Sequence, residues 1–184
     1  MIYPDGLDAL RFKLLSEQNT LAIIGDIGIA MGDYISEAFA ILKTMGNPDI
    51  TIEIDSGGGD AKIGLYIYDC IRLYPGKTTG LVIFRANSMG AIILQACDIR
   101  RCSIHSTILI HCILHTIKIV NFKLNDANHV NELIVDCNIS QEKTEAILIS
   151  KTKRSKGKIQ SEMKKDKPMT AQQALDFGLI DEII

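Results

Sequence analysis

The stretch Leu81-Val-Ile-Phe-Arg-Ala-Asn-Ser-Met-Gly-Ala91 decides how the rest of the chain can fold. Residues 81–84 are β-branched and aromatic enough for a buried strand, and the apolar residues 91–96 predict a helix. Ser88 falls in the turn between them. A hydroxyl at a helix N-terminus lies where free backbone N–H groups and the helix dipole favour developing negative charge. Taken alone, the position also fits a helix N-cap, which is the commoner role of a serine before a helix.

Segments typical of strands and of helices follow one another through the first half of the chain. The strands are expected at residues 20–24, 50–54, 78–86, 101–103 and 107–111. The helices are expected at residues 7–18, 27–45, 61–73 and 89–97. This alternation predicts an α/β fold of βαβ units around a mostly parallel sheet. Functional residues of such sheets gather in loops at the carboxyl ends of the strands, where both Ser88 and the glycines 57–59 fall.

The second half of the chain has a different pattern. Residues 113–124 alternate apolar and polar side chains, as a half-exposed strand would. Residues 125–153 contain neither proline nor glycine and carry apolar residues at helical spacing. A helix of that length exceeds what a compact domain usually needs, so we expect it to project and pack against another subunit. A short basic helix from Ser155 and a last helix at 171–177, capped by Thr170, complete the pattern.

Composition and charge restrict the class of protein. The 184 residues fit one domain with a real core. The net charge of −2 conceals a basic run at 151–167, which carries lysines and arginines with few acids. This run lacks interleaved aromatic residues and any known module, so it predicts a solvated helix face and no nucleic-acid partner.

The sequence predicts neither a membrane-spanning segment nor a secretion signal. No apolar run approaches the ~20 residues that span a bilayer, and the first residues do not read as a signal peptide. The five cysteines show no C-x-x-C spacing, and most of them lie in or beside apolar runs. Such thiols are typical of a reducing compartment, so we expect a cytoplasmic protein that does not bind a membrane.

A serine becomes a nucleophile only with a general base, a group that orients this base, and donors for the oxyanion. His111 is the leading candidate for the base because it closes the apolar run 107–111 and can lie at the mouth of the core. His105, His115 and His129 remain alternatives.

The acid that orients the base must come from loops near the sheet. Asp166 lies between a helix and Pro168, a fixed point that suits this role. The alternatives by residue type are Asp98, Asp126 and Asp136. Glycines 57–59 could leave backbone N–H groups free for an oxyanion, whereas neither phosphate-binding glycine pattern is present. We expect no metal and no cofactor.

Four motifs in the right order resemble the proteolytic subunit of the Clp protease (ClpP). They are Asp55-Ser-Gly-Gly-Gly-Asp-Ala-Lys-Ile-Gly-Leu-Tyr-Ile-Tyr-Asp69, Ala86-Asn-Ser-Met-Gly-Ala91, Ile108-Leu-Ile-His111 and Asp166-Lys-Pro-Met-Thr-Ala-Gln-Gln-Ala-Leu-Asp-Phe-Gly-Leu-Ile-Asp181. The family shows N-S-P-G-G with G-L-x-I-Y-D, then A-S-M-G-A, then M-I-H, then an Asp before its [ST]-A-x-x-A segment. The resemblance runs from about Leu14 to the end of the chain.

The resemblance implies a role for each matching residue. Ser88 matches the nucleophile, His111 the general base and Asp166 the acid that orients it. The backbone N–H groups of Gly59 and Met89 match the oxyanion hole, and Gly58 matches the substrate-binding loop. A serine-type endopeptidase that hydrolyses unfolded proteins and peptides is therefore implied.

The resemblance also implies the fold and the assembly. The fold would be a single domain over 1–184, a crotonase-like ββα spiral. Its head would comprise about 1–124 and 154–184, and its projecting handle helix about 125–153. The family forms homo-oligomers of two stacked heptameric rings around a chamber, and an ATP-driven AAA+ unfoldase delivers the substrate.

Several departures from the family pattern keep other functions open. Gly57 stands where the family has proline, and Cys112-Ile-Leu-His115 replaces the Gln-Pro and glycine-rich segment that normally contacts the peptide. Only about a dozen residues precede Leu14, fewer than the family uses for its axial loops. The alternatives are a catalytically inactive ring subunit, another crotonase-fold hydrolase such as one acting on acyl thioesters, and a Ser-Lys peptidase that uses Lys62.

Overall fold

The computed structural model of the protein describes residues 6–113 and 124–184. Its helices are α1 (Gly6–Gln18), α2 (Ile29–Thr44), α3 (Ala61–Arg72), α4 (Met89–Leu94), α5 (Leu124–Thr152), α6 (Lys156–Met163) and α7 (Ala171–Phe177). Its strands are β1 (Thr20–Ile24), β2 (Ile50–Ser56), β3 (Thr78–Asn87), β4 (Ile99–Cys102), β5 (Thr107–Leu109), β6 (Met169–Thr170) and β7 (Glu182–Ile183). The predicted α/β class is confirmed.

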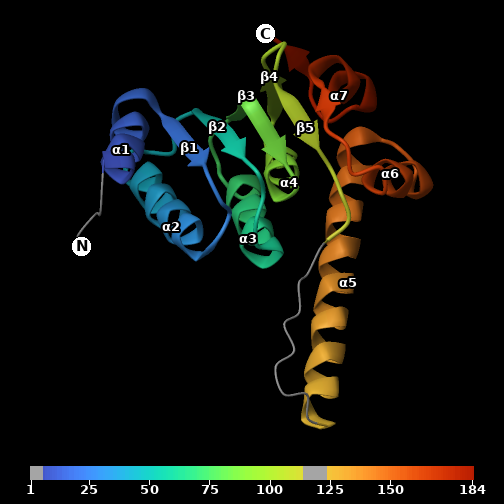
Figure 1. Ribbon diagram of the computed structural model, residues 1–184. Coiled ribbons are helices and arrows are strands. Elements are labelled where there is room, and N and C mark those ends of the chain that lie inside the picture. The colour runs from blue at the N-terminus through green and yellow to red at the C-terminus, as the bar shows by residue number, and fades with distance from the viewer. Residues whose placement is uncertain (1–5, 114–123) are drawn as a thin grey trace.

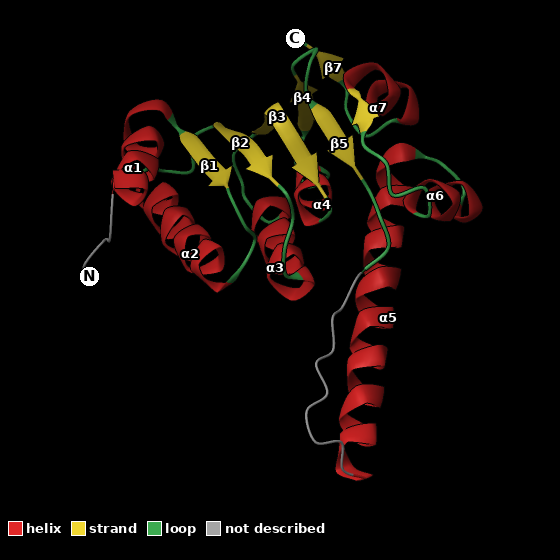
Figure 2. Ribbon diagram, in the orientation of Figure 1, coloured by secondary structure: helices red, strands yellow, loops and turns green. Residues whose placement is uncertain are grey.

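The strands form one sheet in the order β1-β2-β3-β4-β7, all parallel to their neighbours (Figure 2). The long strand β3 has two partners on the same side, because residues 79–82 pair with β4 and residues 85–87 pair with β5. The short strand β6 then runs antiparallel to β5. Since β1, β2, β3 and β5 are parallel, the loops that follow them meet at one edge of the sheet.

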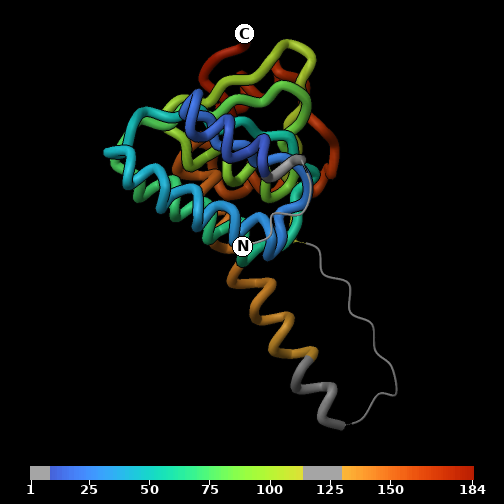
Figure 3. Tube along the Cα trace, turned by 90° about the vertical axis from the view of Figure 1, so that its left-hand side faces the viewer, coloured from blue at the N-terminus to red at the C-terminus, as the bar shows by residue number. Residues whose placement is uncertain are grey.

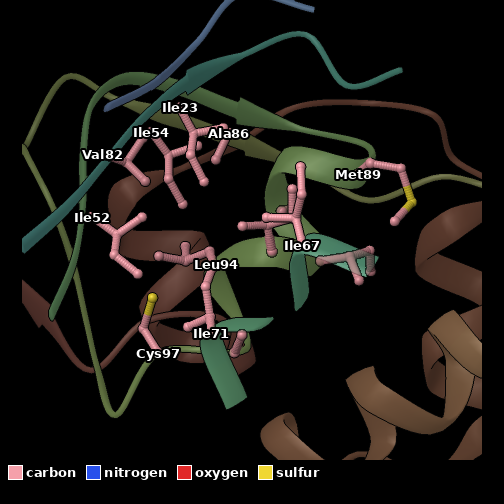
Figure 4. Packing of buried hydrophobic residues seen from close by; sticks show 14 of the residues in the cluster. Ile23, Ile52, Ile54, Ile67, Ile71, Val82, Ala86, Met89, Leu94 and Cys97 are labelled. Atoms are coloured by element: carbon pink, nitrogen blue, oxygen red, sulfur yellow. The ribbon is translucent and has the colours of Figure 1, made fainter. Parts of the chain in front are cut away.

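The core lies between the sheet and the helices α2, α3 and α4, which lie side by side (Figure 1). Alternate residues of β2 point inward, so that Ile52 and Ile54 are fully buried. They pack with Val82 and Ala86 of β3 and with Ile67 of α3 (Figure 4). A close-packed core of this kind fixes the relative positions of the loops at the sheet edge.

Helix α5 extends well beyond the sheet, as two perpendicular views agree (Figures 1 and 3). Its C-terminal part packs on the body of the protein through the buried Leu148, whereas Ile134, Val135 and Ile139 are exposed. The expected long, projecting helix is therefore present. Within the described residues, no helix is both long and apolar enough to cross a bilayer.

The basic run at 151–167 folds as predicted for a solvated helix face. Its short helix α6 begins at the N-cap Ser155, whose hydroxyl accepts a hydrogen bond from the Lys158 N–H. Ile159 and Met163 point into the core, and the lysines from Lys153 onward are exposed.

Several expected boundaries are wrong, and each has a local cause. Helix α2 begins at Ile29 and not at residue 27, because the Ile27 N–H and C=O pair with Gly58 and Asp60. Helix α4 ends at Leu94, three residues early, in a turn that leads to β4. The strand expected at 107–111 ends at Leu109, where its pairing with β3 ends.

Two strands were not expected from the sequence. Strands β6 and β7 contain two residues each, too few to show a periodicity, and exist because β5 and β4 offer partners. The expected strand at 113–124 falls on residues 114–123, which lie outside the described residues, and Ile113 itself is not in a strand.

Candidate active site

Ser88 occupies a sharp turn between β3 and α4. Its backbone has φ 54° and ψ −122°, a combination that a non-glycine residue rarely adopts. Such a conformation costs about 1–3 kcal/mol and persists only where the surrounding structure imposes it. Here the Ser88 N–H donates to the Leu109 carbonyl at 2.8 Å, which holds the turn against β5.

The hydroxyl of Ser88 does not cap the helix that follows it. Ser88 is the N-cap residue of α4 by position, but its side chain makes no capping hydrogen bond. The N-cap interpretation is therefore wrong for the hydroxyl. A strained strand-to-helix turn with a free Oγ is the geometry in which serine nucleophiles of other α/β enzymes are presented.

The glycine loop after β2 packs directly against this turn. A Cβ atom at Gly58 would lie 2.5 Å from the Ser88 Cβ and 3.0 Å from its Oγ, and Gly58 has φ +105°. A Cβ atom at Gly59 would lie 2.2 Å from the Ile27 carbonyl oxygen, and Gly59 has φ +151°. Only glycine fits at either position, so the loop can approach the serine closely.

The Ser56 side chain fixes the glycine loop through hydrogen bonds. Its buried hydroxyl donates to the Gly25 carbonyl at 2.6 Å and accepts from the Gly58 N–H at 3.0 Å. The loop then enters α3 through Asp60, whose carboxylate accepts from the Lys62 and Ile63 N–H groups. The Gly58 N–H thus donates to the Ser56 hydroxyl. The next N–H along the loop, that of Gly59, does not share this acceptor.

The backbone N–H groups beside Ser88 that have no acceptor within the described part of the chain include those of Gly59 and Met89, the two residues that the resemblance assigns to the oxyanion hole. The Met89 N–H belongs to the first turn of α4, where intrahelical acceptors are lacking. Met89 itself sits close to α3 because Gly64 leaves room for its side chain. These two donors are available to a negatively charged oxygen at the serine.

A cavity of about 460 Å³ opens in front of Ser88. Its lining includes Gly57, Gly59, Ser88, Met89 and His111, together with residues of α3 and of α5. The volume lies in the range of ordinary ligand sites. The candidate nucleophile, the candidate base and the residues that carry both N–H groups therefore line one cavity.

His111 lies two residues beyond the end of β5, half-buried at the wall of this cavity. The other histidines do not compete for the position within the described residues. His105 is exposed in the loop that precedes β5, at the opposite end of that strand. The structure leaves out His115, and it does not describe the side chain of His129 on α5.

A second, smaller recess adjoins the first one. It has a volume of about 10 Å³, which is room for one water-sized group, and borders Ser88 and His111. Its walls are mostly apolar and comprise Met89, Ile92, Ile110, Ile113, Thr144 and Met163.

Asp166 lies in the exposed turn between α6 and β6 and does not line either hollow. The β5–β6 pairing nevertheless brings it toward His111. Ile108 pairs with Met169, and His111 and Asp166 each lie three residues beyond that pair on the same side. Among the described residues, no hydrogen bond joins Ser88, His111 and Asp166.

The alternative acids occupy other positions. Asp98 accepts from Thr78 at the amino end of β3, far from the serine along that strand. Asp136 of α5 lines the large cavity, but its Oδ2 accepts from the Lys62 Nζ at 2.7 Å. The side chain of Asp126 falls outside what the structure describes.

The Lys62–Asp136 ion pair bears on whether Lys62 could serve as a base. The hydrogen bond and the charge of Asp136 raise the pKa of Lys62 above its ordinary value. A lysine must lose its proton to act as a general base, so this environment disfavours the Ser-Lys alternative. Within the described residues, no cluster of three His, Cys, Asp or Glu side chains could hold a metal.

The sequence profile of the Clp protease family matches residues 8–184. The chain belongs to the Clp protease family. It is 26% identical over 173 residues to the "ATP-dependent Clp protease proteolytic subunit 3" of Rhodococcus jostii (strain RHA1), covering 92% of this chain and 83% of that protein. Family membership confirms the ClpP-like fold and supports a ClpP-like peptidase function.

One feature of this Clp protease family member was not predicted from its sequence. Gln141, which is half-buried, and Glu145, which is buried, form a polar cluster on α5, in which the Gln141 Oε1 accepts from the Ile113 N–H at 2.8 Å. Their i, i+4 spacing on a helix was a possible signal, since side chains so placed are neighbours. Nothing in the local sequence marks Glu145 as buried.

Proposed function

We propose that this chain is a serine endopeptidase of the Clp type, in which Ser88 attacks the scissile carbonyl. The observation that carries the proposal is the Ser88 hydroxyl, which has no hydrogen-bond partner among the described residues, belongs to a strained turn and lies at a cavity that His111 also lines. Backbone strain of this kind is typical of functional positions.

The first half of the proposed reaction forms an acyl-enzyme. As the Ser88 Oγ bonds to the carbonyl carbon, the His111 imidazole takes the hydroxyl proton. The carbonyl oxygen becomes an oxyanion, which accepts hydrogen bonds from the Gly59 and Met89 N–H groups. His111 then gives its proton to the leaving amine as the C–N bond breaks.

The second half releases the product and restores the enzyme. A water molecule gives a proton to His111 and attacks the acyl carbon through the same oxyanion. The ester C–O bond breaks, and the proton returns to the Ser88 Oγ. Asp166 accepts a hydrogen bond from the other ring N–H of His111, which selects the reactive tautomer and stabilises the imidazolium. Gly58 belongs to the loop that binds the peptide.

We propose that the substrates are unfolded proteins and peptides, hydrolysed inside a chamber formed by two stacked rings of seven copies. In this arrangement residues 1–124 and 154–184 form the head of one domain, and α5 is the handle that joins the rings. The exposed Ile134, Val135 and Ile139 on α5 support docking of another copy, because such apolar side chains lose contact with water at an interface.

The proposal extends to an unfoldase as the partner and to the cytoplasm as the compartment. The name of the Rhodococcus relative includes "ATP-dependent", and we extend this dependence to the present chain as delivery by an AAA+ unfoldase. All five cysteines are free thiols, which supports a reducing cytoplasm.

A second candidate, an inactive ring subunit, is favoured by one observation. The side chains of Ser88, His111 and Asp166 are not joined by hydrogen bonds among the described residues, and Asp166 is exposed. In active enzymes such bonds often tighten only when substrate binds. The two candidates differ in whether Ser88 reacts.

Labelling with a fluorophosphonate probe and cleavage of fluorogenic peptides test the proposal. We expect the wild type to be labelled at Ser88, and Ser88→Ala to lose labelling together with at least ~10³-fold of its peptidase activity. Wild-type protein that assembles into rings but remains unlabelled would establish the inactive-subunit alternative.

The orienting acid is tested by a matched pair of substitutions. Asp166→Asn is expected to lower kcat by about 10³–10⁴-fold, because the amide stabilises the wrong tautomer of the base. Asp136→Asn, which removes an acid that lines the cavity but pairs with Lys62, is expected to lower it less than about tenfold. The reverse result would assign the role to Asp136.

A further inference from the structure

Glu145 is a buried carboxylate that the proposed reaction does not use. Its side chain is only 6% exposed, although it lies on α5, a helix whose N-terminal part extends beyond the sheet (Figure 1). An unpaired carboxylate in such a position would be strongly destabilising, so its partners explain why it is tolerated.

Donors from two helices satisfy Glu145. Its Oε1 accepts from the Gln141 Nε2 at 2.8 Å, and both of its oxygens lie 3.1 Å from the Gln160 Nε2. The Lys156 Nζ lies 3.5 Å from Oε2. Burial alone would raise the pKa of Glu145, but these hydrogen bonds and the lysine charge outweigh it and hold the pKa below its ordinary value. The carboxylate is therefore ionised and only accepts hydrogen bonds.

This restriction fixes the orientation of the Gln141 amide. Its NH₂ group must face Glu145, so its Oε1 faces the opposite way and accepts from the Ile113 N–H at 2.8 Å. Ile113 follows His111 by two residues and lines both hollows beside Ser88. Through one amide, Glu145 thus anchors the segment that leads away from His111.

The other contacts of Glu145 lead toward Asp166. Gln160 and Lys156 belong to α6, which ends at Met163. The Met163 carbonyl accepts from the Asp166 N–H at 3.3 Å, and the Met163 Sδ lies 3.7 Å from the Gln141 Nε2. The turn that carries Asp166 therefore starts from a helix that Glu145 holds.

We propose that Glu145 is a positioning residue, which holds the segments carrying His111 and Asp166 in a fixed relation to each other. The inference rests on the proposed function for its catalytic consequence, although the anchoring itself is independent of it. It also gives a role to Cys112 and Ile113, the described residues of the segment whose sequence departs from the family pattern. Here the polar cluster on α5 and α6 supports that segment from outside the cavity.

Two substitutions break the cluster at different points. Glu145→Leu leaves the Gln141 and Gln160 amides without their acceptor, and Gln141→Leu removes the acceptor of the Ile113 N–H while Glu145 keeps its donors on α6. In both variants we expect the Ile113 amide to exchange with solvent at least tenfold faster, measured by NMR. We also expect the maximal rate of fluorophosphonate labelling at Ser88 to fall at least tenfold, with the probe concentration for half-maximal rate unchanged.

Matched controls separate positioning from stability. Glu142→Leu changes an exposed glutamate on the same helix and should alter neither quantity. Glu145→Gln keeps a carbonyl acceptor for Gln141 and should restore both quantities to within about threefold of the wild type, since the Gln160 amide can turn to accept from the new NH₂ group. All rates are measured well below the melting temperature of each variant.

The outcomes distinguish this inference from the proposed function. If folded Glu145→Leu and Gln141→Leu proteins show wild-type exchange at Ile113 and wild-type labelling, Glu145 is not a positioning residue. If the wild type itself is not labelled, the proposed function fails, and the Ile113 exchange rates alone decide whether Glu145 anchors the segment. Should Glu145→Leu not fold, Gln141→Leu carries the test.

Discussion

A residue with a hydroxyl lies at each end of strand β3, Thr78 at the amino end and Ser88 just past the carboxyl end. The two hydroxyls differ in their hydrogen bonding. At the amino end, Thr78 is buried, and its Oγ1 donates to the Asp98 Oδ2 at 3.0 Å and accepts from the Asp98 N–H at 3.0 Å. Just past the carboxyl end, the Ser88 hydroxyl makes no capping bond, and its backbone is strained. One hydroxyl is fully used for stability, and the other is held available.

The surroundings of the two ends differ in the same way. Beside Thr78, Arg100 donates to Asp181, Gln95 and the Gly178 carbonyl, so the amino edge of the sheet is closed by bonded polar groups. Beside Ser88, the Gly59 and Met89 N–H groups have no acceptor within the described residues. The contrast teaches that, among the described residues, N–H groups without acceptors lie beside Ser88, whereas the polar groups named at the amino end of β3 are bonded. Unpaired groups are expected where the protein binds a ligand.

Of the substitutions that test this contrast, we expect the largest effect from one in the glycine loop beside Ser88. Gly58→Ala places a Cβ 2.5 Å from the Ser88 Cβ at a positive φ, so the loop and the serine turn must separate. We expect a loss of about 2–4 kcal/mol of unfolding free energy from the clash and the strained backbone. Labelling of Ser88 should fall at least ~100-fold, because misplacing a catalytic group by 1 Å has consequences of this order.

Gly57→Ala is the matched control for this substitution. A Cβ atom at Gly57 meets no atom within 4 Å. We expect its stability to stay within about 0.5 kcal/mol of the wild type. Equal effects of the two substitutions in urea denaturation and labelling would mean that the close approach at Gly58 does not hold the serine.

A pair of substitutions at the two hydroxyls should dissociate stability from reactivity. Thr78→Val removes both hydrogen bonds of a buried hydroxyl and should lower the free energy of unfolding by about 1–2 kcal/mol, while Ser88 labelling persists. Ser88→Ala should change stability by less than about 0.5 kcal/mol, while labelling is lost. Urea denaturation and probe labelling measure the two quantities. A substantial loss of stability in Ser88→Ala would contradict the view that this hydroxyl has no partner among the residues that the structure describes.

The sequence was sufficient to predict the main strands, because their side chains alternate between apolar and polar or form apolar runs. β2 alternates buried and half-buried residues along its whole length, and its bounds were predicted closely. The short strands β6 and β7 could not be predicted, since their pairing depends on where β4 and β5 lie in the folded chain. The early end of β5 at Leu109 has the same origin.

Part of the candidate site could be predicted from the sequence, and the reason is physical. Loops after parallel strands meet at one edge, so Ser88, the glycine loop and His111 could be brought together from topology alone. The backbone strain at Ser88 and its missing cap could not be predicted, because a serine before a helix has the same local sequence in either role. The burial of Glu145 was equally hidden, since it depends on donors from α6 that are distant in sequence.

The smallest predicted effect concerns the acid at the satisfied end of β3. The hydrogen bond from the Thr78 N–H lowers the pKa of Asp98 below its ordinary value, and although burial opposes this, the Thr78 hydroxyl and Arg72 reinforce it. The folded protein therefore binds this proton more weakly than the unfolded chain. The resulting stabilisation is fully present above the ordinary aspartate pKa of about 3.9 and is lost as the pH falls through the lower pKa of the folded state.

Asp98→Asn should consequently be less stable than the wild type at pH 7, and the difference should shrink steadily as the pH falls from about 4 to 2. Because the Asp98 side chain is 47% exposed, solvent screening limits the electrostatic part of the difference to less than about 1 kcal/mol. Urea denaturation across this pH range measures it, with Asp33→Asn at an exposed position of α2 as the control for the loss of one charge. A difference that stays constant down to pH 2 would show that the Asp98 carboxylate is not stabilised by Thr78, and the contrast between the two ends of β3 would then rest on the hydroxyl bonds alone.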